Sequence, residues 1–171
     1  MISDLTYKIV SYSVDPDFNS DECVDWAIEM LELGHETEHL LILAGLSKPT
    51  NYFETTDYLR RVLQELGLEE RTGLEGMFNY CTYYILKIAK GRNVRLNLNR
   101  IVSFCQTKCY EESIYDFYLL YWAWDDLDYG NHHPPYWPEA DDANIELIVV
   151  ETARRWLSEN ERQYGRPNHE L

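Results

Sequence analysis

Apolar residues recur every three or four positions along most of the chain, and this period is typical of helices with one buried face. Each apolar run stops at a glycine, a proline or a polar capping residue. These breaks predict helices over about residues 21–33, 37–46, 52–66, 73–90, 94–109, 112–127 and 142–163. Because the connections are short, consecutive helices should pack antiparallel.

The pattern therefore predicts an all-α fold, as an irregular bundle of six to seven helices in a single helical domain over residues 1–171. Helix pairs recur at a spacing of about forty residues, so a short HEAT-like stack of helix pairs is the alternative. Residues 1–19 are expected to form an N-terminal arm, either extended with a short strand or irregular, because apolar and polar residues alternate there. Residues 164–171 are expected to form a tail.

The helix expected at residues 52–66 starts with Asn51 and Glu54, which are spaced as in a capping box. Its inward-facing side chains are predicted to be Phe53, Tyr58, Leu59, Val62, Leu63 and Leu66. We therefore expect this helix to contribute to the core from its first turn to its last.

The stretch from Glu111 to Trp137 is the densest in aromatic side chains, and between Ile114 and Leu127 it holds no basic residue and no helix breaker. A helix that is apolar nearly all round is usually a buried helix. We therefore expect a central helix with its neighbours packed around it. The residues predicted to be substantially buried are Phe117, Leu120, Tyr121 and Trp124.

Three aspartates crowd the last turn of this helix, where the helix dipole is already negative. Such a cluster is unfavourable unless solvent, a basic neighbour or a binding partner compensates it, and aromatic residues follow directly. We predict a partner-binding surface made of Asp125, Asp126, Asp128, Tyr129, Tyr136 and Trp137. The carboxylates would steer a basic partner, and the rings would anchor the contact. The alternative is that Tyr136 and Trp137 only cover the helix.

The net charge of the 171 residues is −15, from 30 acidic and 15 basic side chains. This excess repels phosphate groups, so neither nucleic acid nor an anionic membrane is expected as a partner. A basic protein or a cationic ligand is favoured on the same ground. Solubility alone is the simpler explanation.

The basic residues are unevenly placed: six lysines and arginines and no acid lie between Leu86 and Tyr110, whereas Cys109 to Ala153 holds neither lysine nor arginine. The simplest interpretation is that basic helices neutralise acidic neighbours inside the protein. A basic surface patch is the alternative.

Two groups of residues contain side chains that can bind metal ions. The stretch His35 to His39 reads HETEH, which matches the HExxH pattern of zinc peptidases, but Gly34 places the first histidine at a helix junction. The second group joins the three aspartates with His132 and His133, and its spacing is not that of an EF-hand. The sequence also lacks nucleophile and phosphate-loop motifs. We therefore predict no metal, no cofactor and no enzymatic activity.

The four cysteines are Cys23, Cys81, Cys105 and Cys109, and none belongs to a CxxC pair. The first ten residues lack the long apolar run of a signal peptide. We therefore expect reduced thiols and a cytoplasmic location.

A resemblance to a known group is carried by three stretches, SDECVDWAIEMLELGHETEHLLILAGL, NYFETTDYLRRVLQELGL and YDFYLLYWAWDDL. They resemble the small acidic helical proteins of bacterial toxin–immunity loci, particularly of the Bacteroidetes type. The resemblance implies a cytoplasmic immunity protein that neutralises one toxin domain by direct binding. Nucleic-acid-directed toxins are basic, so an acidic inhibitor would be steered to them. A helical scaffold or adaptor subunit of a regulatory or defence complex is the alternative, and a metal-dependent enzyme is the third hypothesis.

Overall fold

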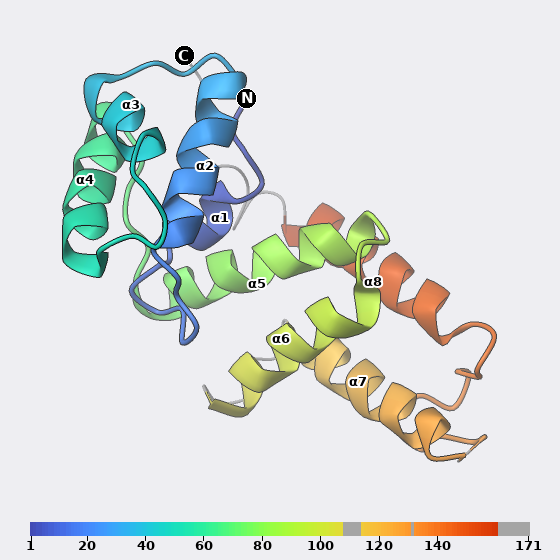
Figure 1. Ribbon diagram of the computed structural model, residues 1–171. Coiled ribbons are helices and arrows are strands. Elements are labelled where there is room, and N and C mark those ends of the chain that lie inside the picture. The colour runs from blue at the N-terminus through green and yellow to red at the C-terminus, as the bar shows by residue number, and fades with distance from the viewer. Residues whose placement is uncertain (108–113, 131, 161–171) are drawn as a thin grey trace. The chain divides into compact units, whose positions relative to one another are not determined.

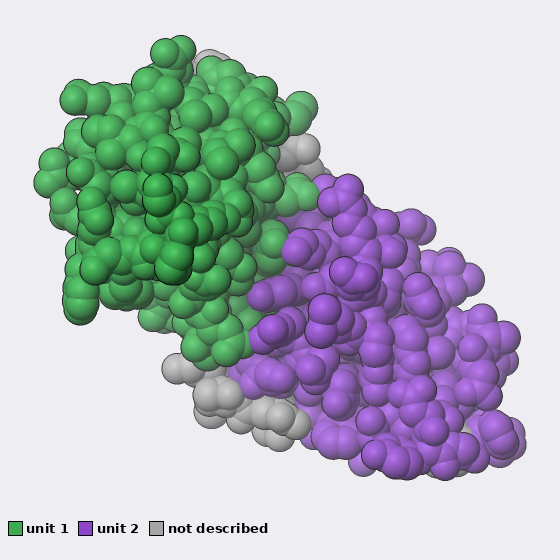
Figure 2. All heavy atoms as spheres, viewed as in Figure 1, with its two compact units in different colours: residues 1–83, 163–171 green, residues 84–162 purple. Residues whose placement is uncertain are grey.

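The computed structural model describes residues 1–107, 114–130 and 132–160. These residues form eight helices and no strand, which confirms the all-α prediction (Figure 1). The helices are α1 (Thr6–Ile9), α2 (Asp21–Glu32), α3 (Glu38–Ala44), α4 (Tyr52–Glu65), α5 (Gly73–Ala89), α6 (Val94–Thr107), α7 (Tyr115–Asp128) and α8 (Ile145–Asn160). The chain divides into two compact units, the first built from residues 1–83 and the second beginning at residue 84 (Figure 2). The expectation of a single domain stays a prediction, and the tail at 164–171 lies outside the described residues.

In the first unit, α2 packs against both α1 and α3, and α3 packs against α4 (Figure 1). Trp26 of α2 is fully buried, and its Nε1 donates a hydrogen bond to Thr6 Oγ1 of α1 at 2.9 Å. Other large, fully buried side chains of this unit are Phe78 and Tyr80 of α5 and, from α1 to α4, Ile9, Met30, Leu40, Leu43 and Leu59.

The prediction of an extended arm or strand near the N-terminus is wrong, because residues 6–9 form α1 and the neighbouring residues form helical turns. The alternation of apolar and polar residues suggested one exposed face, yet the polar residues Thr6, Lys8 and Ser11 are buried as well. Each has a partner inside the protein: Ser11 Oγ, for example, donates to the carbonyl of Tyr7 at 2.9 Å. The two-residue period therefore does not mark a strand here.

Lys8 is a buried cation that ties α1 to α2 and to the loop between them. Its Nζ lies 2.5 Å from Glu22 Oε2 and 3.4 Å from Asp15 Oδ2, and its side chain is only 6% exposed. A buried lysine is tolerated when carboxylates surround it, because its charge is then paired rather than stranded in a medium of low dielectric constant.

The helix α4 starts as predicted, since the side chain of Asn51 accepts hydrogen bonds from the backbone N–H groups of Phe53 and Glu54. The central residues of the predicted stripe, Leu59, Val62 and Leu63, are buried. Phe53 is not, because 81% of it is exposed. At 100° per residue it lies about 120° round the helix from Leu59, so it falls off the buried stripe.

In the second unit, α6, α7 and α8 pack against one another. Phe117 and Leu120 of α7 are fully buried, as predicted. Tyr121 and Trp124 were also predicted to be substantially buried; they are half-buried and thus less enclosed than Phe117 and Leu120. The helix buries a single face, made of Phe117, Leu120, Ala123 and Leu127, and neighbours do not surround it among the described residues.

Two of the four cysteines, Cys23 and Cys81, are fully buried. Burial, together with the nearby Glu22 carboxylate, raises the pKa of Cys23 to about 12. This thiol therefore stays protonated and unreactive at neutral pH. The side chains of Cys105 and Cys109 lie outside the described residues.

The burial of α7 predicts a graded response to truncation. Phe117→Ala should lower the free energy of unfolding by about 3–5 kcal/mol, since the ring is enclosed. Trp124→Ala should cost clearly less, because part of its ring is already in water. Chemical denaturation monitored by circular dichroism measures both, with Tyr129→Ala as an exposed control; equal losses for Phe117 and Trp124 would contradict the one-sided burial of α7.

Removing the buried cation should be costly. Lys8→Met leaves the carboxylates of Asp15 and Glu22 near one another without their counter-charge, so we expect a loss of about 3–5 kcal/mol of unfolding free energy. Lys48→Met is the matched control, because Lys48 pairs with Asp25 at the surface, and it should cost less than about 1 kcal/mol. Urea midpoints for the two variants test this, and equal midpoints would refute a stabilising role for Lys8.

Candidate partner-binding surface

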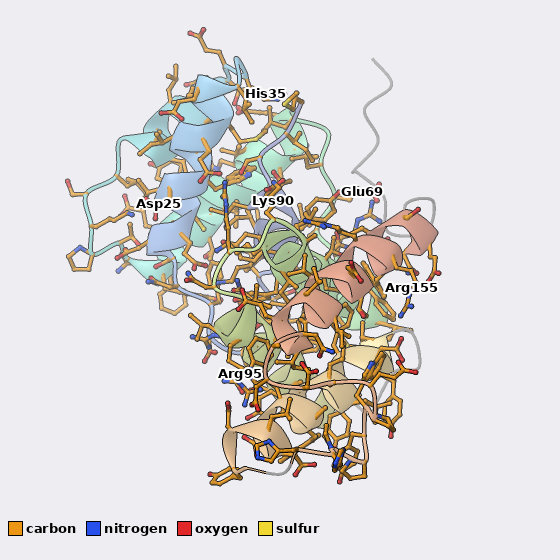
Figure 3. All side chains as sticks on the ribbon, turned by 90° about the vertical axis from the view of Figure 1, so that its right-hand side faces the viewer. Asp25, His35, Glu69, Lys90, Arg95 and Arg155 are labelled. Carbon is orange, nitrogen blue, oxygen red and sulfur yellow. The ribbon has the colours of Figure 1, made fainter. Side chains whose placement is uncertain are left out.

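Arg95 of α6 contacts the last two turns of α7 (Figure 3). Its Nη2 lies 3.4 Å from Asp125 Oδ1 and 3.2 Å from Asp128 Oδ2, and its Nη1 donates to the carbonyl of Tyr121 at 3.1 Å. One guanidinium therefore compensates two carboxylates at the negative end of the helix dipole.

The same guanidinium also covers aromatic rings of α7. Its Cζ lies 4.6 Å from the centre of the Tyr121 ring and 5.3 Å from that of Trp124. These distances fit cation–π contacts. Such a contact needs a ring that is not fully enclosed, because the guanidinium must lie over its face. This contact explains why Tyr121 and Trp124 are half-buried although the sequence pattern placed them in the core.

The predicted neutralisation of acidic residues by basic helices is confirmed at Arg95. Arg155 of α8, which lies outside the predicted basic helices, makes a similar pair, with its Nη2 3.2 Å from Asp116 Oδ2. Of the compensations considered for the three aspartates, a basic neighbour therefore applies to Asp125 and Asp128. Arg95 does not pair with Asp126.

The Oδ2 atom of Asp126 is buried and accepts no hydrogen bond within the described part of the chain. One turn earlier on α7, Nε1 of Trp122 is also buried and donates none. An unpaired buried polar group costs about 1–3 kcal/mol, so this donor and this acceptor are destabilising as they stand. Among the buried side-chain atoms of α7 that the structure describes, these two have no hydrogen-bond partner.

The remaining predicted residues follow this helix end in the chain. Tyr129 is 86% exposed directly after α7. Tyr136 is exposed and Trp137 is half-buried in the loop that leads to α8. We call Asp125, Asp126, Asp128, Tyr129, Tyr136 and Trp137 the acidic corner. The structure brings Asp125 and Asp128 together around Arg95, and it places the last two rings on the following loop.

Aromatic rings continue from the acidic corner along α7. Tyr115 and Tyr118 are stacked at 5.6 Å between ring centres, and Tyr118 meets Trp122 edge to face at 6.2 Å. Tyr115 is exposed, and the other two rings are half-buried. The sequence pattern could not separate these rings from core rings, because tyrosine and tryptophan serve both places.

The HETEH stretch does not form a zinc-binding helix. His35 lies before α3, and its Nε2 is 2.8 Å from the carbonyl of Met1. His39 instead places Nδ1 2.5 Å from Glu65 Oε1, and hydrogen bonds from Thr37 and then from His39 lower the pKa of that carboxyl. At the acidic corner, His132 Nδ1 lies 3.4 Å from Asp142 Oδ2. Among the described residues, no group of three histidine, cysteine or carboxylate side chains is arranged to hold a metal ion.

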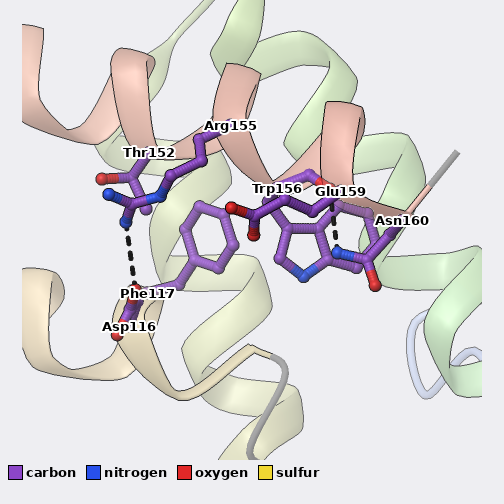
Figure 4. Close-up of a pocket in the computed structure, with 7 residues that line it drawn as sticks. All are labelled: Asp116, Phe117, Thr152, Arg155, Trp156, Glu159 and Asn160. Atoms are coloured by element: carbon purple, nitrogen blue, oxygen red, sulfur yellow. Dashed lines mark hydrogen bonds and ion pairs between the residues drawn. The ribbon is translucent and has the colours of Figure 1, made fainter.

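A cavity of about 330 Å³ lies between α7 and α8 in the second unit (Figure 4). Phe117 and Trp156 contribute its aromatic lining, while Asp116 and Arg155 at one side are paired with each other. Asn160 Nδ2 donates to the carbonyl of Trp156 at 2.9 Å. The described lining contains no cysteine, histidine or serine, so it offers no nucleophile or general base of these types.

Comparisons with known proteins found no matching family model, no similar curated protein and no similar solved structure. None of the described helices is long and apolar enough to cross a membrane. The class of protein that the fold and the surface define is thus an acidic all-helical protein with a cluster of carboxylates and aromatic rings.

Removing the guanidinium should expose the repulsion that it compensates. Arg95→Gln leaves Asp125 and Asp128 at the negative helix end and uncovers two rings, so we expect a loss of about 1–2 kcal/mol in unfolding free energy. The loss should shrink in high salt, because salt screens the freed carboxylates. Arg155→Gln, which breaks one exposed pair, is the control and should cost less than about 1 kcal/mol. Thermal denaturation at low and high salt tests this, and equal losses in the two variants would contradict it.

Proposed function

We propose that the protein is an acidic protein-binding module, and specifically an immunity protein that neutralises a cognate bacterial toxin by binding it directly in the cytoplasm. The observation that supports the proposal most is the acidic corner, where the exposed ring of Tyr129 directly follows the three aspartates of α7, and Tyr136 and Trp137 come on the next loop of the chain. Interfaces draw most of their affinity from a few such aromatic anchors.

The charge of the chain supports the same partner. A net charge of −15 attracts a basic protein over a distance of several ångströms and speeds its association. Asp126 is the carboxylate of the corner that is left for such a partner, because Arg95 engages the other two.

The experiment that tests this proposal starts with affinity purification of the full chain from its source cells at low salt. The captured protein is then expressed alone and together with this chain. A basic protein that arrests growth alone, and no longer does so with this chain, supports the immunity function. A harmless binding partner would support the adaptor alternative, and the absence of any partner would reject both.

Charge removal at the acidic corner should then act on association. Asp126→Asn, which leaves the pairs of Arg95 intact, should slow binding of the captured protein, and changing all three aspartates to asparagine should slow it further and flatten its salt dependence. Trp137→Ala should mainly speed dissociation. Asp116→Asn, at the other end of α7, removes the same charge and is the control. Stopped-flow rates at several salt concentrations measure these effects. Wild-type association rates in the triple variant would show that the acidic corner is not the docking face.

A further inference from the structure

Exposed aromatic rings also occur in the first unit, at the start of α4. Phe53 is 81% exposed and its neighbour Tyr52 is 49% exposed. Their rings meet edge to face at 5.5 Å between centres. One exposed apolar residue is ordinary, but neighbouring exposed rings form an apolar patch, and such patches are typical of interaction sites.

These rings belong to a row that begins in the protein interior. The ring of buried Tyr12 lies 5.4 Å from that of Phe18, which in turn lies 5.9 Å from the ring of Tyr52. Burial falls along the row from Tyr12 to Phe53. We call Phe18, Tyr52 and Phe53 the aromatic edge, because they are the part of the row that reaches the surface.

The aromatic edge is held in place at both ends. The hydroxyl of Tyr12 accepts a hydrogen bond from Arg60 Nε at 3.0 Å and donates one to Glu70 Oε2 at 3.1 Å. At the other end, Asn51 caps α4, and both the backbone N–H and the hydroxyl of Thr50 donate to Asp21 of α2. These two bonds lower the pKa of the Asp21 carboxyl. Rings fixed in this way lose little conformational entropy when a partner covers them.

Most of the negative charge of the chain lies in this unit. Residues 1–83 hold sixteen acidic and five basic side chains, which amounts to −11 of the total −15. The five basic side chains already have partners: Lys8 with Glu22, Lys48 with Asp25, Arg61 with Asp57, Arg71 with Glu75, and Arg60 with the Tyr12 hydroxyl. Beside the aromatic edge, Asp17 and Glu54 are exposed acids that directly neighbour Phe18 and Phe53 in the chain.

We propose that the aromatic edge is a docking surface for a basic protein, with the ring of Phe53 entering an apolar pocket of that partner. The inference rests on the proposed binding function but assigns a surface separate from the acidic corner. The charge indicates which partner binds. The net charge of −11 on residues 1–83 attracts a basic protein and repels a second copy of the same unit. The buried end of the row holds the rings ready for contact.

The contact is tested first by placing the photoreactive residue benzoylphenylalanine at position 53 of the full chain in its source cells. Leu74 is the matched control position, since it is also an exposed apolar residue in the same unit and the second residue of its helix. Illumination should crosslink position 53, and not position 74, to a basic protein. A crosslink from position 53 only to a second copy or within the chain would overturn the proposal.

The crosslinked protein is then purified, and its binding to unmodified variants of this chain is measured by surface plasmon resonance. Phe53→Ala should speed dissociation about tenfold or more, because an aromatic anchor is lost. Asp17→Asn combined with Glu54→Gln should slow association severalfold and weaken its salt dependence, with little change in dissociation. Leu74→Ala should bind as the wild type does. Circular dichroism establishes that each variant is folded before its rates are compared.

Failure of this inference can be told from failure of the proposed function. If the purified partner binds the wild type and Phe53→Ala with the same dissociation rate, the aromatic edge is not contacted, while the binding function stands. If the wild type binds no protein at all, the proposed function fails and the docking surface fails with it.

Discussion

Shortage of cations is the constraint on which the arrangement of this protein depends, because 15 lysines and arginines face 30 carboxylates. Each cation therefore decides which carboxylates are neutralised and which remain to act on solvent or a partner. Lys8 is buried, where it pairs with Glu22 and Asp15 and links α1 to α2. Arg95 contacts α7, where it pairs with two aspartates and lies over two aromatic rings. Because these pairs are partly or fully shielded from water, their contribution exceeds that of the exposed pairs elsewhere.

The two units use their cations differently, and this difference shapes the two surfaces proposed for binding. In the second unit, seven basic side chains between residues 84 and 160 lie outside the uncertain segments, and two of them are paired with aspartates of α7. The acidic corner is thus a partly neutralised surface whose remaining carboxylate is Asp126. In the first unit, five cations serve sixteen acids, so the field around the aromatic edge stays strongly negative. Long-range attraction of a basic partner follows net charge rather than any single carboxylate, which favours the first unit as the place of first encounter.

The sequence predicted the helices well because apolar period and capping residues are local signals, and the start of α4, where Asn51 caps the helix, shows this. The start of α8 was predicted less well, because the helix begins at Ile145 rather than at residue 142. The sequence-based prediction failed where the burial of a side chain depends on a residue that is distant in the chain. The residues of α1 alternate like a strand, but their polar side chains pair with Trp26 and Glu22, which are distant in sequence. Trp124 resembles a core ring until Arg95 of another helix lies over it. The acidic corner could be located from charge and ring content, whereas the pairing of Asp125 and Asp128 required the position of α6.

Phe53 and Asp126 are informative for the same physical reason, since each is a residue that the fold leaves in an unfavourable setting. A large ring in water forgoes about 1.5–3 kcal/mol that burial would provide, and an unpaired buried oxygen costs a similar amount. Local conflicts of this kind concentrate at functional sites, because a binding partner can supply the missing contact. Phe53 would gain an apolar surface from a partner, whereas the Oδ2 atom of Asp126 is buried and a donor would reach it only after a local rearrangement. Phe53 is therefore the residue to which a complex would supply the missing contact most directly.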